Sequence, residues 1–257
     1  GMLEEEGLDY VLVPCGLAVM SAYHVWLLVT ILRRPNRTVI GINADSRRLW
    51  VHSLMADPLK NGTLAVQTIR NNIMASTLLA TTAITLSSLI SVVVSSTSSS
   101  SSSSASKLIY GNESSILSSI KYFCILLCFL VAFLFNVQSI RYYAHVSFLV
   151  TLPTSKDNKD AIEYVTRNLN RGSMFWSLGL RAFYFSFPLF MWIFGPIPMF
   201  VCCCVISSLL YFLDTTTSFT RQLHTHSFRE EGNAGDVESV GHSQMIVGPL
   251  HVSPTCT

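Results

Sequence analysis

The stretch YVLVPCGLAVMSAYHVWLLVTILRRPNRTVIGINADSRRLWV, residues 10–51, joins a long apolar segment to a block rich in arginine. Its apolar part, residues 10–32, is interrupted only by Ser21, His24 and Thr30. Because roughly 20 apolar residues of helix cross a bilayer core about 30 Å thick, this part predicts a transmembrane span. The arginines that follow indicate which side of the membrane the chain has reached.

The composition of the chain favours lipid as its solvent. Of the 257 residues, 50% are apolar and only 12% are charged, about half the charged share of a soluble domain. The formal net charge of +2 is too small to indicate a nucleic-acid partner. The seven cysteines form no C-x-x-C pair, so they predict neither a zinc site nor a disulfide framework. We expect no metal and no cofactor.

Further apolar segments predict more spans, at residues 73–94, 116–140, 173–194 and, more briefly, 197–213. Between the last two, Gly195, Pro196 and Pro198 predict either a tight re-entry or a full hairpin. Lys121, near the start of its span, is expected to snorkel outward. The predicted fold class is an all-α polytopic transmembrane helical bundle over residues 10–213, with four spans, and a fifth if the short segment also crosses.

Lysine and arginine are concentrated between spans, in residues 33–70 and 141–171. The positive-inside rule places both segments in the cytoplasm, and residues 1–9 and 95–115 outside. With five spans, residues 214–257 are also cytoplasmic. The arginines after the first span are candidate contacts for anionic lipid headgroups, which attract basic residues near the membrane surface; they are Arg33, Arg34, Arg37, Arg47 and Arg48.

Two polar segments outside the spans lack apolar surface to bury. Residues 95–115 begin with a serine tract and predict a flexible exterior linker, and residues 214–257 predict a disordered tail. Of three Asn-x-Ser/Thr sequons, those at Asn36 and Asn61 fall in the cytoplasmic segment. Only Asn112 is then a candidate for glycosylation.

The cytoplasmic segments also predict two short amphipathic helices. Residues 46–56, after Asp45 as a cap, gather apolar side chains on one broad side. Residues 160–170 place apolar residues at intervals of three and four. Helices of this kind can lie on the inner headgroups.

Polar side chains within the spans are the candidates for a ligand site or a pathway, because placing them against hydrocarbon costs at least about 2.5 kcal/mol when they are charged. Arg181 is central in its span, and Arg70, Thr77 and Thr81 share one face of a helix that could line a path from the cytoplasm. The full set of candidates is His24, Arg70, Asn71, Asn72, Thr77, Thr81, Asn136, Gln138 and Arg181.

Structural roles compete with each of these interpretations. Threonines at helical spacing in a span commonly serve helix packing, and His24 can be a buried, hydrogen-bonded histidine. Asn136 and Gln138 can be interfacial, since Arg141 follows them closely. Arg181 is an ordinary snorkelling residue if its helix begins only after it.

Catalytic signatures are missing from the sequence. It has no G-x-S-x-G, H-E-x-x-H or G-x-x-x-x-G-K-[ST] motif, and the predicted spans contain no Asp or Glu. We therefore expect a protein that is not an enzyme. A proton-driven pump is also disfavoured, because such pumps usually need a carboxylate within the membrane.

Three blocks of sequence carry a family resemblance: PNRTVIGINADSRRLWV (35–51), ADPLKNGTLAVQTIRNNIMAST (56–77) and FSFPLFMWIFGPIPMF (185–200). Together they resemble a family of plant and bacterial membrane proteins known as domain of unknown function 599. The resemblance covers most of residues 8–214. It implies a multi-helical integral membrane protein and supplies no reaction, ligand or catalytic residue.

Two functions lead at the level of sequence, ahead of a third, an enzyme that acts on lipid, for which Ser21 and His24 are the only local candidates. The first is a non-enzymatic membrane protein that passes a small solute or anion along the surface formed by Arg70, Thr77 and Arg181, or that binds anionic lipid. The alternative is a structural or scaffolding component of a membrane complex. We expect a multi-pass protein of the plasma membrane or an endomembrane, since no retention or transit signal is visible.

Overall fold

A computed structural model describes residues 2–99, 115–152 and 159–215 of the chain. Every regular element in these ranges is helical, which confirms the all-α class. A single isolated β-bridge, between Thr38 and Thr215, joins two helix ends. The elements are α1 (Met2–Arg33), the short 3₁₀ helix η1 (Pro35–Arg37), α2 (Val39–Ala56), α3 (Pro58–Ser99), α4 (Ser115–Leu149), α5 (Lys159–Met191) and α6 (Pro196–Asp214).

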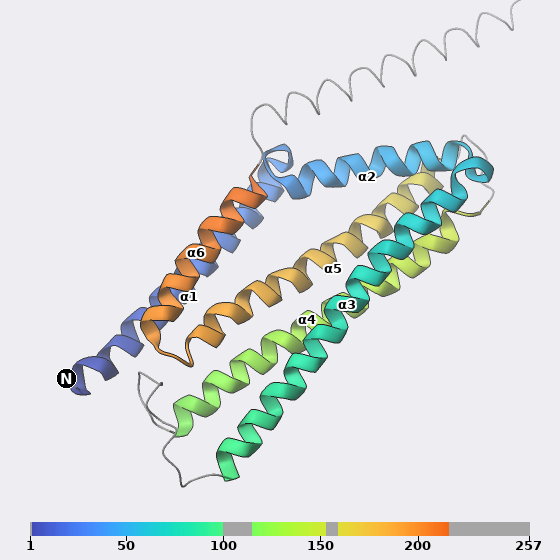
Figure 1. Ribbon diagram of the computed structural model, residues 1–257. Coiled ribbons are helices and arrows are strands. Elements are labelled where there is room, and N and C mark those ends of the chain that lie inside the picture. Colours follow the sequence, from blue (N-terminus) through green and yellow to red (C-terminus); the bar gives the residue numbers. More distant parts are fainter. Residues whose placement is uncertain (1, 100–114, 153–158, 216–257) are drawn as a thin grey trace, which may run out of the picture.

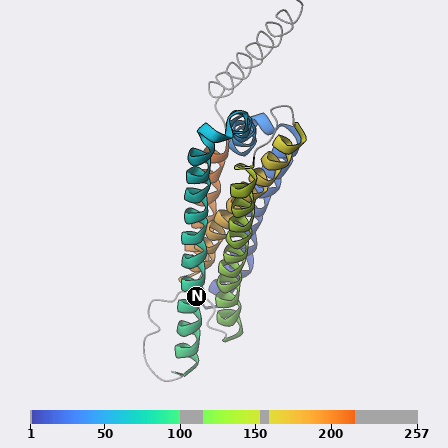
Figure 2. The same cartoon turned by 90° about the vertical axis from the view of Figure 1, so that its right-hand side faces the viewer.

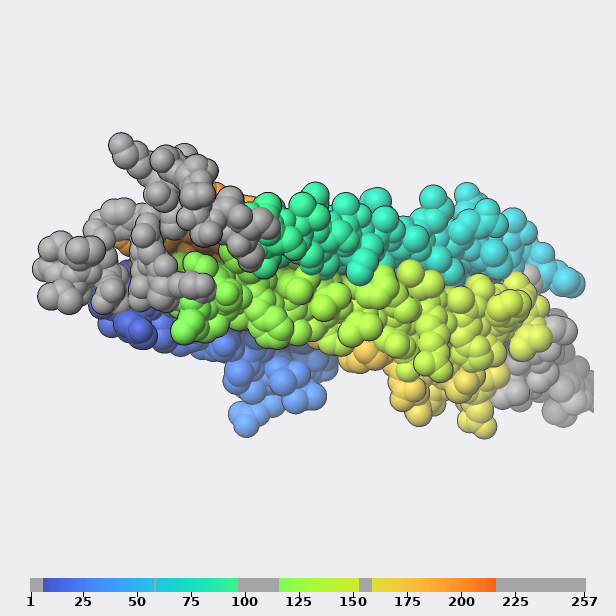
Figure 3. Space-filling model, turned by 90° about the horizontal axis from the view of Figure 1, so that it is seen from below, coloured from blue at the N-terminus to red at the C-terminus, as the bar shows by residue number. Residues whose placement is uncertain are grey.

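Five long helices run up and down, and α2 lies across one end of them (Figure 1). We call this end the arginine end, since α1 and α6 finish there beside η1. The N-terminus lies at the opposite end (Figure 1). Helix α4 packs between α3 and α5, while α1 packs on α6. Figures 2 and 3 show α3 and α4 side by side along their length.

Four of the helices are long and apolar enough to cross a membrane. They provide the candidate spans Gly7–Arg33, Leu59–Ser96, Ile116–Leu149 and Pro196–Asp214. Only 17–28% of the residues in their most apolar windows are buried. Large apolar side chains exposed in such number are typical of a surface that lipid or another protein covers, so these helices are compatible with a multi-pass membrane protein.

Helix α5 is not among these four spans, although residues 173–194 were predicted to be one. Its first half is polar, and its second half carries Arg181 together with several Ser, Tyr and Trp residues. It nevertheless packs along α4, and it contacts α6 and α2. Its neighbours therefore bury some of its polar side chains, among them Thr166, Asn168 and Ser186.

Two separate apolar cores divide the bundle along its length. One lies towards the arginine end and joins α2 to the adjoining ends of α3, α4 and α5; Val51, Ile69, Val146 and Val165 are at its centre. The other joins α1, α3, α4 and α6 and the end of α5, around Met20, Ile125, Met199 and Cys203. A smaller cluster of Tyr23, Leu27 and Leu210 joins α1 to α6.

The helices extend well beyond the predicted spans. Helix α3 begins at Pro58 rather than residue 73, and residues 160–170 form the start of α5 rather than a separate surface helix. The polar residues of these extensions stay helical because their buried faces pack in the core below α2. Residues 95–99 of the serine tract, predicted to be part of a flexible linker, continue α3.

Helix α2 begins earlier than predicted because Thr38, not Asp45, is its N-cap. The Thr38 hydroxyl accepts a hydrogen bond from the Gly41 backbone N–H at 3.2 Å and donates one to the Pro35 carbonyl at 2.9 Å. A Cβ on Gly41 would lie 2.2 Å from that carbonyl oxygen. Glycine is therefore needed where η1 folds tightly against α2.

The turn between α5 and α6 makes a hairpin rather than a re-entry. Gly195 has φ 143°, a conformation that favours glycine, and Pro196 occupies the first turn of α6. Helix α6 then runs back to the arginine end (Figure 1). The predicted glycosylation site at Asn112 and the tail beyond Thr215 lie outside the described residues.

Candidate functional site

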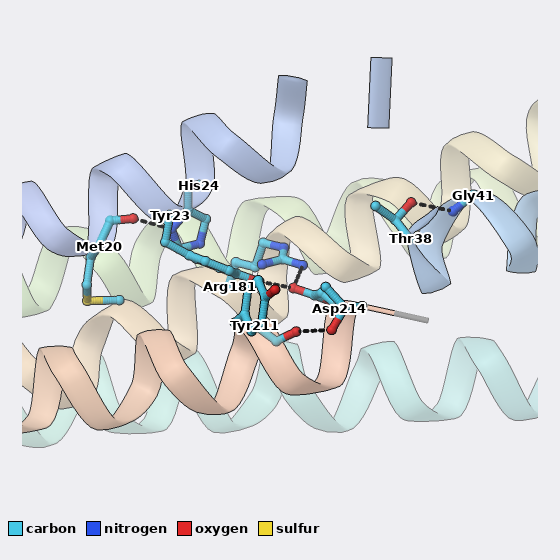
Figure 4. A network of polar contacts seen from close by, with 9 residues as sticks. Met20, Tyr23, His24, Thr38, Gly41, Arg181, Tyr211 and Asp214 are labelled. Atoms are coloured by element: carbon cyan, nitrogen blue, oxygen red, sulfur yellow. Dashed lines mark hydrogen bonds and ion pairs between the residues drawn. The ribbon is translucent and has the colours of Figure 1, made fainter. Parts of the chain in front are cut away.

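A cluster of polar side chains from three helices lies near the end of α6 (Figure 4). Arg181 of α5 donates a hydrogen bond to the Asp214 carboxylate of α6 at 2.7 Å, and the Tyr23 hydroxyl of α1 donates to the same oxygen. The side chains of Arg181 and Asp214 are only 14% and 13% exposed. An ion pair therefore neutralises the one charged side chain predicted in the middle of a span.

His24 lies beside this ion pair, one residue after Tyr23. Its Nδ1 is 2.8 Å from the Met20 carbonyl oxygen, so Nδ1 carries the proton and donates it there. The Nε2 of His24 and one terminal nitrogen of Arg181 are buried without a hydrogen-bond partner. Two of the candidate residues, His24 and Arg181, thus lie close together in a packed setting between α1, α5 and α6.

Asn136 of α4 packs tightly against Gly179 of α5. Asn136 is fully buried and donates a hydrogen bond to the Ala132 carbonyl at 2.8 Å. A Cβ on Gly179 would lie 2.5 Å from the Asn136 amide nitrogen. Asn136 is thus a packing residue between helices, not an interfacial one. Gln138, two residues further, is half-buried.

The other candidates on α3 lie apart from this cluster. Thr77 and Thr81 are exposed on the outside of the bundle, and each donates its hydroxyl to a carbonyl of its own helix. Arg70 and Asn71 line a separate hollow of about 580 Å³ with Gln67 and Thr151, in the first half of α3, and Asn72 is half-buried. The structure does not form the predicted surface shared by Arg70, Thr77 and Arg181.

Three arginines gather instead in a hollow of about 550 Å³ between the ends of α1 and α6. We call it the arginine hollow. Arg33, Arg34 and Arg37 are all exposed there, and no carboxylate is among its lining residues. Its remaining lining residues are Trp26, Val29, Thr30, Tyr211 and Thr215, and the rings of Trp26 and Tyr211 lie 5.2 Å apart.

The two arginines of α2 have different surroundings. The Arg47 guanidinium donates a hydrogen bond to the Asn170 side-chain oxygen of α5 at 2.7 Å, and burial lowers its pKa below the ordinary value. It therefore serves the packing of α2 on α5. Arg48 is exposed and faces a groove between the same two helices.

Buried polar residues also occur at the opposite end of the bundle. Lys121 is 5% exposed, and its ammonium lies 5.3 Å from the centre of the Trp192 ring. The Trp192 indole N–H donates to the buried Asp9 carboxylate at 3.3 Å. The prediction that Lys121 snorkels outward is wrong. The Trp192 ring and the nearby Asp9 carboxylate stabilise the charge of Lys121 within the bundle.

Sequence reasoning missed Asp9 and Asp214 because each adjoins a predicted span and was assigned to the flanking segment. Both lie within the helices of candidate spans. The signal that could have found Asp214 is Arg181 itself, since an arginine inside a bundle needs a carboxylate or carbonyl partner. In the described residues, no group of three His, Cys, Asp or Glu side chains is placed to hold a metal ion.

Comparisons with known proteins add a family. The family described as "Protein of unknown function, DUF599" matches residues 11–219. No curated protein and no solved structure matches the chain. Because the match covers well over half of the sequence, from the first span to the end of α6, the protein belongs to the DUF599 family.

Proposed function

We propose that this protein is a non-enzymatic membrane protein that binds anionic phospholipid headgroups in the arginine hollow. The observation that carries the proposal is the convergence of Arg33, Arg34 and Arg37 on one hollow without a lining carboxylate. Guanidinium groups match phosphate in geometry and charge. A phosphate in the hollow would supply the negative charge that the described residues around it do not.

The position of the hollow favours a lipid over a soluble anion. It lies at the end of two candidate spans, α1 and α6. Trp26 and Tyr211 border it, and such aromatic side chains are typical of the membrane interface. A lipid headgroup held there would keep its acyl chains beside the exposed apolar side chains Val29 and Leu32 of α1.

A solute path through Arg181 has less support than lipid binding. Arg181 is paired with Asp214 and largely buried, and the candidate residues Thr77 and Thr81 face outward. A path needs polar side chains that share a hydrated cavity, whereas Arg181 is buried within the bundle and Thr77 and Thr81 lie apart from it on the outside. We propose no transport role for them.

A scaffolding role is the second candidate, and one observation favours it. The core around Val51, Ile69 and Val165 extends the helices beyond the length that a bilayer requires. This part of the bundle presents α2 and the ends of α3, α4 and α5 as a rigid surface at the arginine end. Protein partners would bind this surface without contacting the arginine hollow.

Native mass spectrometry of the full chain tests lipid binding. In detergent, we expect phosphatidylglycerol to bind more tightly than phosphatidylcholine. The variant Arg33→Gln/Arg37→Gln should lose about 2 kcal/mol of this binding, at about 1 kcal/mol for each basic residue. This corresponds to roughly thirtyfold in affinity.

The matched control is Arg70→Gln/Arg141→Gln, which removes two exposed arginines outside the hollow. It should bind phosphatidylglycerol within about threefold of the natural sequence, since it changes the same net charge at a distance. Equal losses in the two variants would mean that overall charge, not the arginine hollow, attracts the lipid, and the proposal would fail.

A further inference from the structure

A second polar surface, which we call the α2–α5 groove, lies between α2 and the first half of α5. Its volume is about 460 Å³. Figure 1 shows α2 crossing the same end of the bundle from which α5 begins. The polar residues that line the groove are Asp45 and Arg48 of α2 and Glu163, Thr166, Arg167, Asn170 and Arg171 of α5.

The charges in the groove are of both signs, unlike those of the arginine hollow. Arg167 donates to the Glu163 carboxylate at 3.1 Å, so these two charges compensate each other. Arg48, Arg171 and Asp45 form no ion pair among the described residues. The groove therefore offers two guanidinium groups and one carboxylate to a ligand.

Thr166 supplies an independent sign that the groove accepts a polar group. It is 6% exposed, and its hydroxyl is buried without a hydrogen-bond partner. Threonines elsewhere in the bundle, such as Thr77 and Thr81, donate to the carbonyl four residues earlier. A buried hydroxyl without a partner is costly. Thr166 borders the groove, and a change to the other rotamer that threonine adopts in helices would turn its hydroxyl to a ligand oxygen there.

The walls of the groove are fixed in place. The hydrogen bond of 2.7 Å from Arg47 to Asn170 ties α2 to α5 beside it. Apolar residues of both helices, including Val51, Val165 and Leu169, pack together in the core behind. The charged side chains are thus attached to two helices that are already packed together before a ligand binds.

We propose that the α2–α5 groove binds a phosphoethanolamine group, a phosphate joined to a primary ammonium. The phosphate accepts hydrogen bonds from Arg48 and Arg171 and from the Thr166 hydroxyl, and the ammonium donates to Asp45. A purely anionic headgroup leaves Asp45 beside a like charge. A choline headgroup has no N–H to donate. The proposal is independent of the arginine hollow, since none of its residues is shared.

Titration of the full chain in detergent with short-chain lipids tests this assignment. The probes are dioctanoyl phosphatidylethanolamine and dioctanoyl phosphatidylcholine, which differ only in the methyl groups on nitrogen. We expect the ethanolamine lipid to bind about tenfold more tightly, from one charge-assisted hydrogen bond. Asp45→Asn should abolish this difference, and Thr166→Val should weaken the binding of both lipids.

Soluble O-phosphoethanolamine distinguishes the source of the group. If O-phosphoethanolamine displaces the lipid and binds as tightly as the lipid does, a free metabolite is a sufficient ligand. If only the lipid binds, the ligand is a lipid headgroup. Equal binding of the two lipids by the natural sequence, or a preference that persists in Asp45→Asn, overturns the proposal.

Two control variants separate this result from the arginine hollow. Arg33→Gln/Arg37→Gln should retain the preference for ethanolamine over choline, and Asp45→Asn should retain phosphatidylglycerol binding. Loss of the ethanolamine preference in Arg33→Gln/Arg37→Gln would place the ethanolamine lipid in the arginine hollow and overturn the α2–α5 assignment. Unchanged thermal unfolding of Asp45→Asn excludes a folding defect as the cause of its effect.

Discussion

Arg181 and Asp214 stand 33 positions apart in the chain, yet they form the most buried ion pair among the described residues. Taking either charge alone into a membrane interior is costly, and a partner at hydrogen-bond distance offsets that cost. Tyr23 adds a second donor to the carboxylate. Asp214 therefore links the end of α6 to both α5 and α1, beside the apolar cluster of Tyr23, Leu27 and Leu210.

Breaking this pair from one side should destabilise the protein more than removing both charges. Arg181→Met or Asp214→Asn alone should each cost about 3–5 kcal/mol, because a buried polar group is left without its partner. The double variant Arg181→Met/Asp214→Leu should cost much less than the sum. Thermal unfolding in detergent, followed by size-exclusion chromatography, measures the stability of the two single variants and the double variant.

The exposed pair of Arg167 and Glu163 provides the matched control for that experiment. Its side chains are 64% and 63% exposed, so Arg167→Met should change stability by at most about 0.5 kcal/mol. Strictly additive costs for Arg181 and Asp214 would contradict a coupled pair.

At the scale of elements, hydropathy predicted where helices occur but not where they end. Residues 58–72 are mostly polar, with no apolar run that distinguishes them from a loop; they are helical because Ala65 and Ile69 are buried in the core below α2. Residues 160–170 were recognised as amphipathic, and their continuity with the second half of α5 depends on packing against α4. Contacts between distant residues, such as Arg181 with Asp214, carry no local pattern at all.

The α4–α5 contact gives a prediction at this scale. Gly179→Ala places a Cβ 2.5 Å from the Asn136 amide nitrogen, so the buried Asn136 side chain must move or the helices must separate, at a cost of about 1–3 kcal/mol. Asn136→Ala in the same chain removes the obstacle and should restore most of the lost stability. The midpoint of thermal unfolding in detergent measures both variants.

Gly62→Ala on α3 is the control, because no atom lies within 4 Å of its added Cβ. It should leave stability unchanged or raise it by up to about 1 kcal/mol, through helix propensity. If Gly179→Ala were equally harmless, α4 and α5 would not approach as closely as the structure has them.

At the scale of the molecule, the bundle combines apolar spans with a polar extension at one end. The arginine hollow and the α2–α5 groove both lie at this end, where α1 and α6 finish and α2 crosses. The positive-inside rule, applied to the sequence, expects this end in the cytoplasm. Anionic lipids are concentrated in the cytoplasmic leaflet, so the orientation and the proposed ligand agree with each other.

A density map of the full chain in nanodiscs that contain phosphatidylglycerol tests lipid binding in the arginine hollow most directly. We expect headgroup density between α1 and α6, with its phosphate within hydrogen-bond distance of Arg33, Arg34 or Arg37. The same density should be absent from a map of Arg33→Gln/Arg37→Gln. An arginine hollow that holds only water in the natural sequence, while lipid is ordered elsewhere around the bundle, would contradict the proposed function.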